Sequence, residues 1–149
     1  RTAWLYSEFG HNFLKTMLNL TATKPQLKVV FDQCGTPTYA GDLARCIFQI
    51  VENRLFEGHE GVYHFSNEGV CSWYDFTKEI FRQAVEMGHE EYAEDRLIVS
   101  PVTTEEYGIS KAARPFNSRL DKSKLKENGF EPLPTWQDAL GRYLKEIEF

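Results

Sequence analysis

Apolar residues recur at the spacing of one helical face in four stretches of the chain. The stretches are residues 13–24, 40–55, 73–88 and 136–147. Ser72 and Asp75 have the spacing of a capping box before the third stretch, and Thr135 and Asp138 have it before the fourth. The pattern predicts four amphipathic helices, the last two with defined starts.

Short runs rich in β-branched and aromatic residues lie between the predicted helices. They predict strands at residues 2–7, 27–31, 61–66 and 97–99. Asp121 is expected to cap a short helix that ends at Gly129, because glycine readily closes a helix in the left-handed conformation. Residues 101–118 have no steady period and predict a long irregular loop. Strands that alternate with helices indicate the α/β class.

Charge and hydropathy exclude some classes of protein. The 149 residues include 17 Lys and Arg against 22 Asp and Glu, a net charge of −5. This balance argues against a nucleic-acid-binding protein that neutralises many phosphates, although it leaves room for a local basic pocket that binds a small anion. No stretch approaches the roughly 18–20 consecutive apolar residues of a membrane span, so we expect no membrane partner.

The cysteines and histidines do not have the spacing of a disulfide framework or a metal centre. The three cysteines, Cys34, Cys46 and Cys71, are an odd number without the paired spacing of a zinc site. We expect reduced thiols, which favours a cytoplasmic location. The four histidines lack metal-ligand spacing, and no metal ligand is assigned.

The predicted strands are too few for a complete parallel sheet, which helices normally cover on both faces. The chain also begins at Arg1, without a methionine and directly before a predicted strand. We therefore expect a piece of a longer protein. Its uncovered sheet surface should lower its stability or be buried against another copy, and a homodimer is one such arrangement.

Common nucleotide-binding and catalytic motifs are missing from these residues. The ten glycines form no G-x-G-x-x-G loop and no P-loop. Tyr-x-x-x-Lys, a spacing that can place a phenol and an ammonium on one helical face, occurs at Tyr74 and at Tyr107. Tyr74 falls in the first turn of a capped helix and Tyr107 in the irregular loop, so we interpret both as chance matches.

A cluster of Trp4, Tyr6, Phe9 and Asn12 lies where the first predicted strand ends and a helix begins. In open α/β sheets ligands bind at the carboxyl ends of strands, so this cluster is a candidate binding site. The alternative is that the aromatic residues belong to the core and that Asn12 caps the helix.

Two further segments carry candidate polar groups. Residues 32–39 follow a strand and are either a site loop or a plain turn. Arg114 lies in the irregular loop among proline and asparagine, where a guanidinium suits bidentate recognition of phosphate. The alternative for Arg114 is an ordinary surface residue.

Taken together, the ordered motifs resemble one family, the dTDP-4-dehydrorhamnose reductases. The motifs are Arg-Thr-Ala-Trp-Leu-Tyr-Ser7, Phe-Gly-His-Asn-Phe13, Asp-Gln-Cys-Gly-Thr-Pro-Thr-Tyr39, Tyr-His-Phe-Ser66, Cys-Ser-Trp-Tyr-Asp-Phe76 and Ala-Arg-Pro-Phe-Asn-Ser118. The resemblance covers the whole chain. It implies an extended short-chain dehydrogenase/reductase that uses NADPH or NADH to reduce dTDP-4-dehydro-L-rhamnose to dTDP-L-rhamnose for surface polysaccharide.

The resemblance also implies which part of such a reductase is present. The family's glycine-rich cofactor loop and its catalytic Thr and Tyr-x-x-x-Lys would precede Arg1, so no catalytic residue is assigned and the chain alone should be inactive. We expect the C-terminal part of a Rossmann-like NAD(P)-binding fold. Residues of about 1–24 and 40–66 would complete the dinucleotide-binding fold, and residues of about 25–39 and 67–149 would form the substrate-binding lobe.

Individual site residues follow from the same resemblance. Trp4 matches a tryptophan that lines the sugar pocket, and Asn12 and Arg114 match positions near the diphosphate of the dTDP-sugar. Thr2 and Ala3 would lie near the nicotinamide. A catalytically silent relative, such as the regulatory subunit of methionine adenosyltransferase, and another sugar-nucleotide epimerase or dehydratase are the alternatives.

Overall fold

A computed structural model describes residues 1–21, 23–108 and 112–147. Short strands alternate with helices, as the α/β prediction requires. In chain order the elements are β1 (Leu5–Tyr6), α1 (Phe13–Thr21), β2 (Gln26–Val30), β3 (Cys34–Gly35), β4 (Thr38–Tyr39), α2 (Ala40–Glu52), β5 (Cys71–Ser72), α3 (Trp73–Glu86), the 3-10 helix η1 (Glu90–Tyr92), β6 (Ile98–Val102), α4 (Thr104–Tyr107), α5 (Ser123–Glu127) and α6 (Trp136–Leu144).

Within the described residues every sheet consists of two strands. β1 pairs with β4 and β2 with β6, both in parallel, whereas β3 and β5 run antiparallel. Pro101 lies inside β6, where a missing N–H group is tolerated because β2 is the only strand beside it. The parallel pairs confirm the α/β class.

The four long helices predicted from periodicity are all present. Ser72 accepts a hydrogen bond from the Asp75 N–H at 3.0 Å, and the Asp75 carboxylate accepts one from the Ser72 N–H at 2.9 Å, which completes the predicted capping box of α3. Thr135 caps α6 by accepting from the Asp138 N–H. The short helix α5 also forms, and Gly129 beyond it has a φ of 75°.

Two predictions of secondary structure are wrong. Residues 61–66 form no strand. Among the described residues their one backbone partner is Arg1, which bonds to the Phe65 N–H and the Tyr63 carbonyl, and one residue cannot form a ladder. Residues 101–107 are regular and not a loop, since β6 continues to Val102 and α4 follows. Residues 109–111 of the predicted loop lie outside the described residues.

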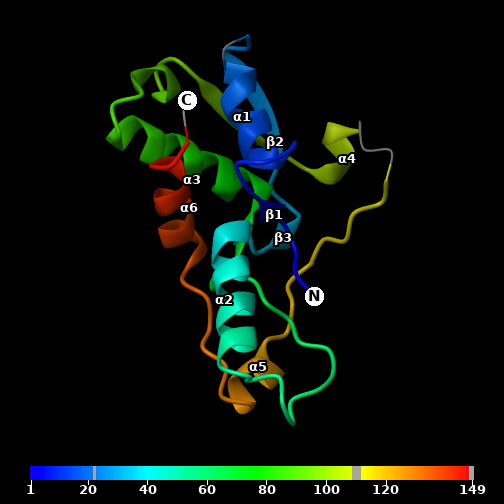
Figure 1. The fold of residues 1–149 in the computed structure, drawn as a ribbon. Helices are drawn as coiled ribbons and strands as arrows, with labels where there is room; N and C mark the ends of the chain where they lie inside the picture. Colours follow the sequence, from blue (N-terminus) through cyan, green and yellow to red (C-terminus); the bar gives the residue numbers. More distant parts are fainter. Residues whose placement is uncertain (22, 109–111, 148–149) are drawn as a thin grey trace.

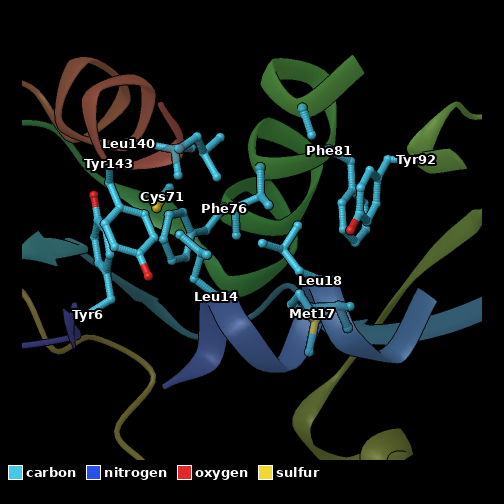
Figure 2. Packing of buried hydrophobic residues seen from close by; sticks show 14 of the residues in the cluster. Tyr6, Leu14, Met17, Leu18, Cys71, Phe76, Phe81, Tyr92, Leu140 and Tyr143 are labelled. Carbon is cyan, nitrogen blue, oxygen red and sulfur yellow. The ribbon is translucent and has the colours of Figure 1, made fainter. Parts of the chain in front are cut away.

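The hydrophobic core gathers where α3 meets α1, α6 and β2 (Figures 1 and 2). Leu14, Phe76, Ile80 and Leu140 are almost completely buried there. Figure 2 shows Tyr6 and Tyr143 together at one end of this cluster, where their rings meet edge to face with centroids 5.2 Å apart. Residues from both ends of the chain therefore share one core.

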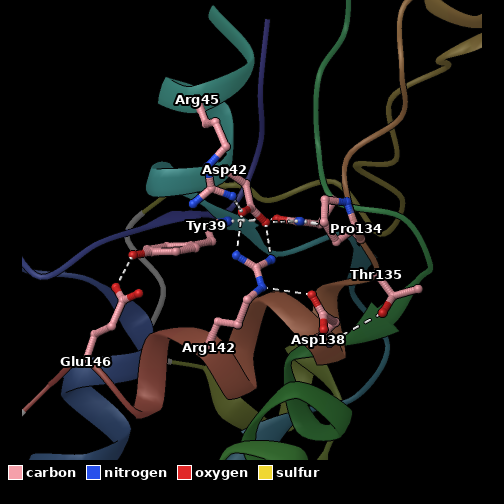
Figure 3. A network of polar contacts seen from close by, with 9 residues as sticks. Tyr39, Asp42, Arg45, Pro134, Thr135, Asp138, Arg142 and Glu146 are labelled. Carbon is pink, nitrogen blue, oxygen red and sulfur yellow. Dashed lines mark hydrogen bonds and ion pairs between the residues drawn. The ribbon is translucent and has the colours of Figure 1, made fainter. Parts of the chain in front are cut away.

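A buried ion pair fastens α2 to α6 (Figure 3). The Arg142 guanidinium donates to both carboxylate oxygens of Asp42, at 2.6 and 2.7 Å, and the Asn67 amide donates to the same carboxylate at 2.9 Å. Burial alone would raise the pKa of Asp42, but the bonds from Arg142 and Asn67 lower it overall. The Asp42 side chain is only 1% exposed, so the two helices are joined through a fully satisfied carboxylate.

The apolar face of α2 remains largely uncovered. Ile47, Phe48 and Val51 are 53%, 63% and 59% exposed, although their spacing is that of a core-facing stripe. Figure 1 shows α2 extending away from the core elements α1 and α3. The periodicity thus predicts the helix correctly, but no described segment packs over the exposed side chains.

Candidate functional site

Trp4 has a strained backbone. Its φ is 49°, in the left-handed region that bulky residues rarely adopt. Its carbonyl accepts a hydrogen bond from the Thr38 N–H at 3.0 Å, next to the pairing of β1 with β4. Strain of this kind costs about 1–3 kcal/mol and persists only where the surroundings fix the residue.

The indole of Trp4 is held from several sides. It stacks on the indole of Trp73 with ring centroids 3.5 Å apart and 7° between the planes. Its Nε1 donates to the Ser118 hydroxyl at 3.0 Å, and that hydroxyl donates to the Cys34 carbonyl at 3.1 Å. A Cβ at Gly35 would lie 2.5 Å from the ring, so only glycine leaves room for it.

A cavity of about 360 Å³ lies next to this stack. Its aromatic lining comes from Phe13, Trp73 and Tyr107, and its two cationic residues are Lys28 and Arg114. Trp4 is not among the lining residues. Because Trp73 both lines the cavity and stacks on Trp4, Trp4 lies behind the aromatic lining.

Arg114 and Lys28 are exposed, and neither forms an ion pair or a side-chain hydrogen bond with any other described residue. Two unpaired cations beside aromatic rings suit a ligand that combines an anionic group with a ring. The structure therefore brings the predicted residue Arg114 to the same cavity as Trp73, with Trp4 in the next layer.

Asn12 has another structural role. Its side-chain N–H donates to the Ser7 carbonyl at 2.8 Å, and its side-chain oxygen accepts from the Lys15 N–H at 3.0 Å. Asn12 thus caps α1, the alternative that the sequence left open. It is not among the residues lining the cavity, and a role near a diphosphate stays a prediction.

Thr2 and Ala3 lie at the start of the chain. Thr2 is exposed, and the Ala3 carbonyl accepts from the Thr38 hydroxyl at 2.7 Å. These two residues do not form a dinucleotide cradle by themselves, because such a cradle needs a glycine-rich turn before a helix and these 149 residues have none. Their position near a nicotinamide stays a prediction.

Residues 32–39 are more ordered than a plain turn, since they contain β3 and β4. Asp32 accepts hydrogen bonds from the N–H of Thr104, at 3.0 Å, and from its hydroxyl, at 2.7 Å. The backbone bond from Thr104 is the main reason that the pKa of Asp32 is lowered. The buried Gln33 donates to the Thr104 hydroxyl and also lines the cavity, so this segment is joined to α4 beside the site.

Other candidate residues have structural partners. Lys78, of the first Tyr-x-x-x-Lys match, is bonded to Glu94, whereas the lysine of the second match lies outside the described residues. The ring of His64 forms a hydrogen bond with the Asp121 carbonyl at 2.8 Å. Over residues 1–21, 23–108 and 112–147, no group of three His, Cys, Asp or Glu side chains is placed to hold a metal ion.

A larger cavity of about 530 Å³ lies between α3 and η1. The cations on its rim are already paired, Lys78 with Glu94 and Arg82 with Glu79 and Glu86. The cavity at Trp73 is smaller, but its two cations, Lys28 and Arg114, form no ion pair with any described residue. In the described part of the chain, no helix has the length and apolar character needed to cross a bilayer.

Sequence reasoning missed Phe13 and Trp73 as site residues, because both fit the apolar stripes of their helices. A helical period cannot distinguish a ring that faces the core from one that lines a cavity at the helix end. The signal available was position. Phe13 is the first residue of α1 and Trp73 the first of α3, where a side chain can reach beyond the packed helix.

Relatives of known name match nearly the whole chain. The family described as the RmlD substrate binding domain matches residues 1–149. A spore coat polysaccharide biosynthesis protein, SpsK of Bacillus subtilis, is 44% identical over 98% of this chain and 46% of its own length. A dTDP-4-dehydrorhamnose reductase of Aggregatibacter actinomycetemcomitans is 42% identical over 94% of this chain and 47% of its own.

Solved structures agree with these matches. A dTDP-4-dehydrorhamnose reductase of Bacillus anthracis in complex with NADP superposes with a TM-score of 0.82 at 40% identity, over 99% of this chain and 47% of that one. An orthologue from Clostridium acetobutylicum gives a TM-score of 0.83 at 40% identity, over 100% of this chain and 48% of that one.

The chain spans about half the length of the curated relatives it matches. The match over residues 1–149 and the agreement in fold confirm the resemblance drawn from the motifs. The chain belongs to the family of RmlD substrate binding domains.

Proposed function

We propose that this chain is the sugar-nucleotide-binding part of a reductase that converts dTDP-4-dehydro-L-rhamnose to dTDP-L-rhamnose with NAD(P)H. The observation that carries the proposal is the cavity in which unpaired Arg114 and Lys28 lie beside the aromatic ring of Trp73. A nucleotide sugar supplies a diphosphate for the cations and a ring for the aromatic lining. The names of the matched reductases support the same substrate.

Arg114 is proposed to bind the diphosphate, because a guanidinium can donate two parallel hydrogen bonds to phosphate oxygens. Lys28 adds a second positive charge to the cavity lining. Asn12 would hold the start of α1 in place through its cap. Thr2 and Ala3 would lie near the nicotinamide. The complex of the Bacillus anthracis relative supports NADP as the cofactor.

In this proposal, none of the residues named above carries out hydride transfer. Residues of about 1–24 and 40–66 would complete the cofactor fold, and the remainder would form the substrate lobe. Neither Tyr74 nor Tyr107 is assigned a catalytic role. A cytoplasmic site of action fits a biosynthetic enzyme with reduced cysteines.

The proposal is tested by following NADPH oxidation with dTDP-4-dehydro-L-rhamnose as substrate. The intact protein that contains these residues should turn over, and the isolated 149 residues should not. Equal rates in both would contradict the proposed division. Binding of dTDP-rhamnose by an intact protein that never oxidises NADPH would favour a catalytically silent relative.

A further inference from the structure

We propose that Asp32 is a positioning residue for the cavity at Arg114, and that it acts by holding α4 so that Tyr107 closes one end of this cavity. The inference rests on the proposed function and adds a residue that affects ligand binding through another residue. Asp32 is bonded to the first residue of α4, and Tyr107 is the last residue of that helix.

α4 is too short and too exposed to hold its own position. It is a single turn of four residues, Thr104–Tyr107, and all four are at least partly exposed. In Figure 1 it lies apart from α1, α3 and α6, the helices that build the core. A lone helical turn is unstable in water, because forming it fixes several residues for very few hydrogen bonds. The position of α4 therefore depends on the groups that bind it.

Asp32 binds α4 from the end of β2. Both of its carboxylate oxygens lie 3.0 Å from the Thr104 nitrogen and accept its N–H, and one of them also accepts from the Thr104 hydroxyl at 2.7 Å. The buried Gln33 donates to the same hydroxyl at 2.9 Å. The capping box of α4 occupies the N–H groups of Thr103 and Glu106, and the N–H between them in the chain, that of Thr104, goes to Asp32. A carboxylate at the start of a helix is also favoured by the helix dipole.

Tyr107 lies between two cavities. It lines the cavity of about 360 Å³ that contains Arg114, and it also lines a second cavity of about 410 Å³. Lys28 and Val29, on β2, line both cavities as well. Tyr107 is thus part of a shared wall, which limits how far a ligand in the first cavity can extend toward the second. A shift of α4 would move this wall.

A wall that is already in place favours binding, because the ligand does not have to order it. The N–H of Tyr107 donates to the Thr103 carbonyl at 3.0 Å, and the N–H of Gly108 donates to the Thr104 carbonyl at 3.3 Å. These bonds join the end of α4 to its start, so a start that is fixed by Asp32 also fixes Tyr107. Without the Asp32 carboxylate, ligand binding would have to order α4 first.

The test is a double-mutant cycle in the intact protein, with dTDP-rhamnose binding measured by calorimetry. We expect Asp32→Ala to weaken binding about threefold to tenfold, the loss expected when a side chain must be ordered on binding. In a Tyr107→Ala background the same change should have little effect, because Asp32 acts through Tyr107. Asp32→Asn keeps an acceptor for the Thr104 N–H and should restore most of the affinity. Glu105→Gln, which neutralises an exposed carboxylate on the same turn, should bind as the wild type does.

Hydrogen exchange of the ligand-free protein gives a second readout. The amides of Thr104 and Tyr107 should exchange faster in Asp32→Ala, whereas that of Ile80, in the core helix α3, should not. If Asp32→Ala fails to fold, Thr104→Val takes its place in the cycle, since it removes the hydroxyl that Asp32 binds and keeps the backbone bond.

Equal weakening by Asp32→Ala in the wild-type and Tyr107→Ala backgrounds would overturn the inference. Unchanged affinity of Asp32→Ala, while Arg114→Ala binds weakly, would also overturn it and leave the proposed function standing. A wild type that does not bind dTDP-rhamnose would overturn the proposed function itself.

Discussion

At the scale of single residues, two arginines differ in whether their guanidinium groups have carboxylate partners. Arg142 is committed to the buried Asp42 carboxylate and to Asp138, and its pKa is raised mainly by the bond to Asp42. Arg114 has no such partner among the described residues and lies at a cavity. A satisfied guanidinium stabilises the fold, whereas an unpaired one is available to a ligand.

Replacing Arg114 with alanine should weaken binding of dTDP-rhamnose by about 1.5–3 kcal/mol, the usual contribution of a hydrogen bond to a charged group. Calorimetry on the intact protein measures this change. Arg119→Ala is the matched control, because Arg119 lies in the same segment and is bonded to Asn117. Equal affinities in the wild type and Arg114→Ala would remove Arg114 from the site.

Asp42 should make stability depend on pH. Its folded-state pKa lies below the ordinary 3.8, so its contribution is complete above that value and is lost as the pH falls through the lower folded-state pKa. Asp42→Asn should lower the free energy of unfolding by about 3 kcal/mol at neutral pH, since it leaves Arg142 without its carboxylate.

Urea unfolding of both proteins, from neutral pH to below 3.8, measures this effect. The difference between wild type and Asp42→Asn should shrink as the pH falls. Arg45→Ala should change the free energy of unfolding little. The Arg45 side chain is 64% exposed, and its ion pair with the same carboxylate is long, at 3.5 Å. A difference that stays constant with pH would show that the carboxylate charge is not the cause.

At the scale of elements, the start of α3 matters most, because it supports both the core and the site. The capping box orients the first turn, and Trp73 is the first helical residue after Ser72. Phe76 and Ile80, on the same helix, are buried in the core. The position of Trp73 at the cavity is thus linked to a helix cap that can be seen in the sequence.

Ser72→Ala should lower the free energy of unfolding by about 1 kcal/mol, since the Asp75 N–H loses its acceptor. Thermal and urea unfolding measure the loss. Ser123→Ala is the comparison, an exposed serine at the first position of α5, where we expect a change within about 0.5 kcal/mol. A similar loss in both variants would argue against a special role for the α3 cap.

The sequence was informative about local structure and less so about contacts between distant segments. Caps and helical periods predicted α1, α2, α3 and α6, because these signals act over a few residues. The strand predicted at residues 61–66 is absent for a non-local reason. A strand needs a neighbouring strand to pair with, and β-rich composition does not report whether one is present. The contact of Trp73 with Trp4 joins residues far apart in the chain, so no local pattern reports it.

At the scale of the whole molecule, the main departure from ordinary packing is the exposed apolar stripe on α2. Ile47, Phe48 and Val51 present apolar surface that soluble proteins normally cover. A chain with such a face gains stability by burying it against another protein surface. The chain spans about half the length of the relatives it matches. We therefore expect another protein surface to cover this stripe.

The 149-residue chain should therefore associate as its concentration rises, as measured by sedimentation velocity. Phe48→Ser with Val51→Ser should reduce this association. Ile98→Ser should not, because Ile98 is equally exposed, at 57%, but lies on β6 away from α2. A monomer that melts cooperatively at every concentration would argue against an unsatisfied apolar face.

A crystal structure of the intact protein with dTDP-rhamnose would decide where the nucleotide sugar binds. We expect its diphosphate within hydrogen-bond distance of the Arg114 guanidinium and one of its rings against the aromatic side chains at this cavity. A nucleotide sugar bound elsewhere, with the cavity between Trp73 and Arg114 empty, would contradict the assignment of this site.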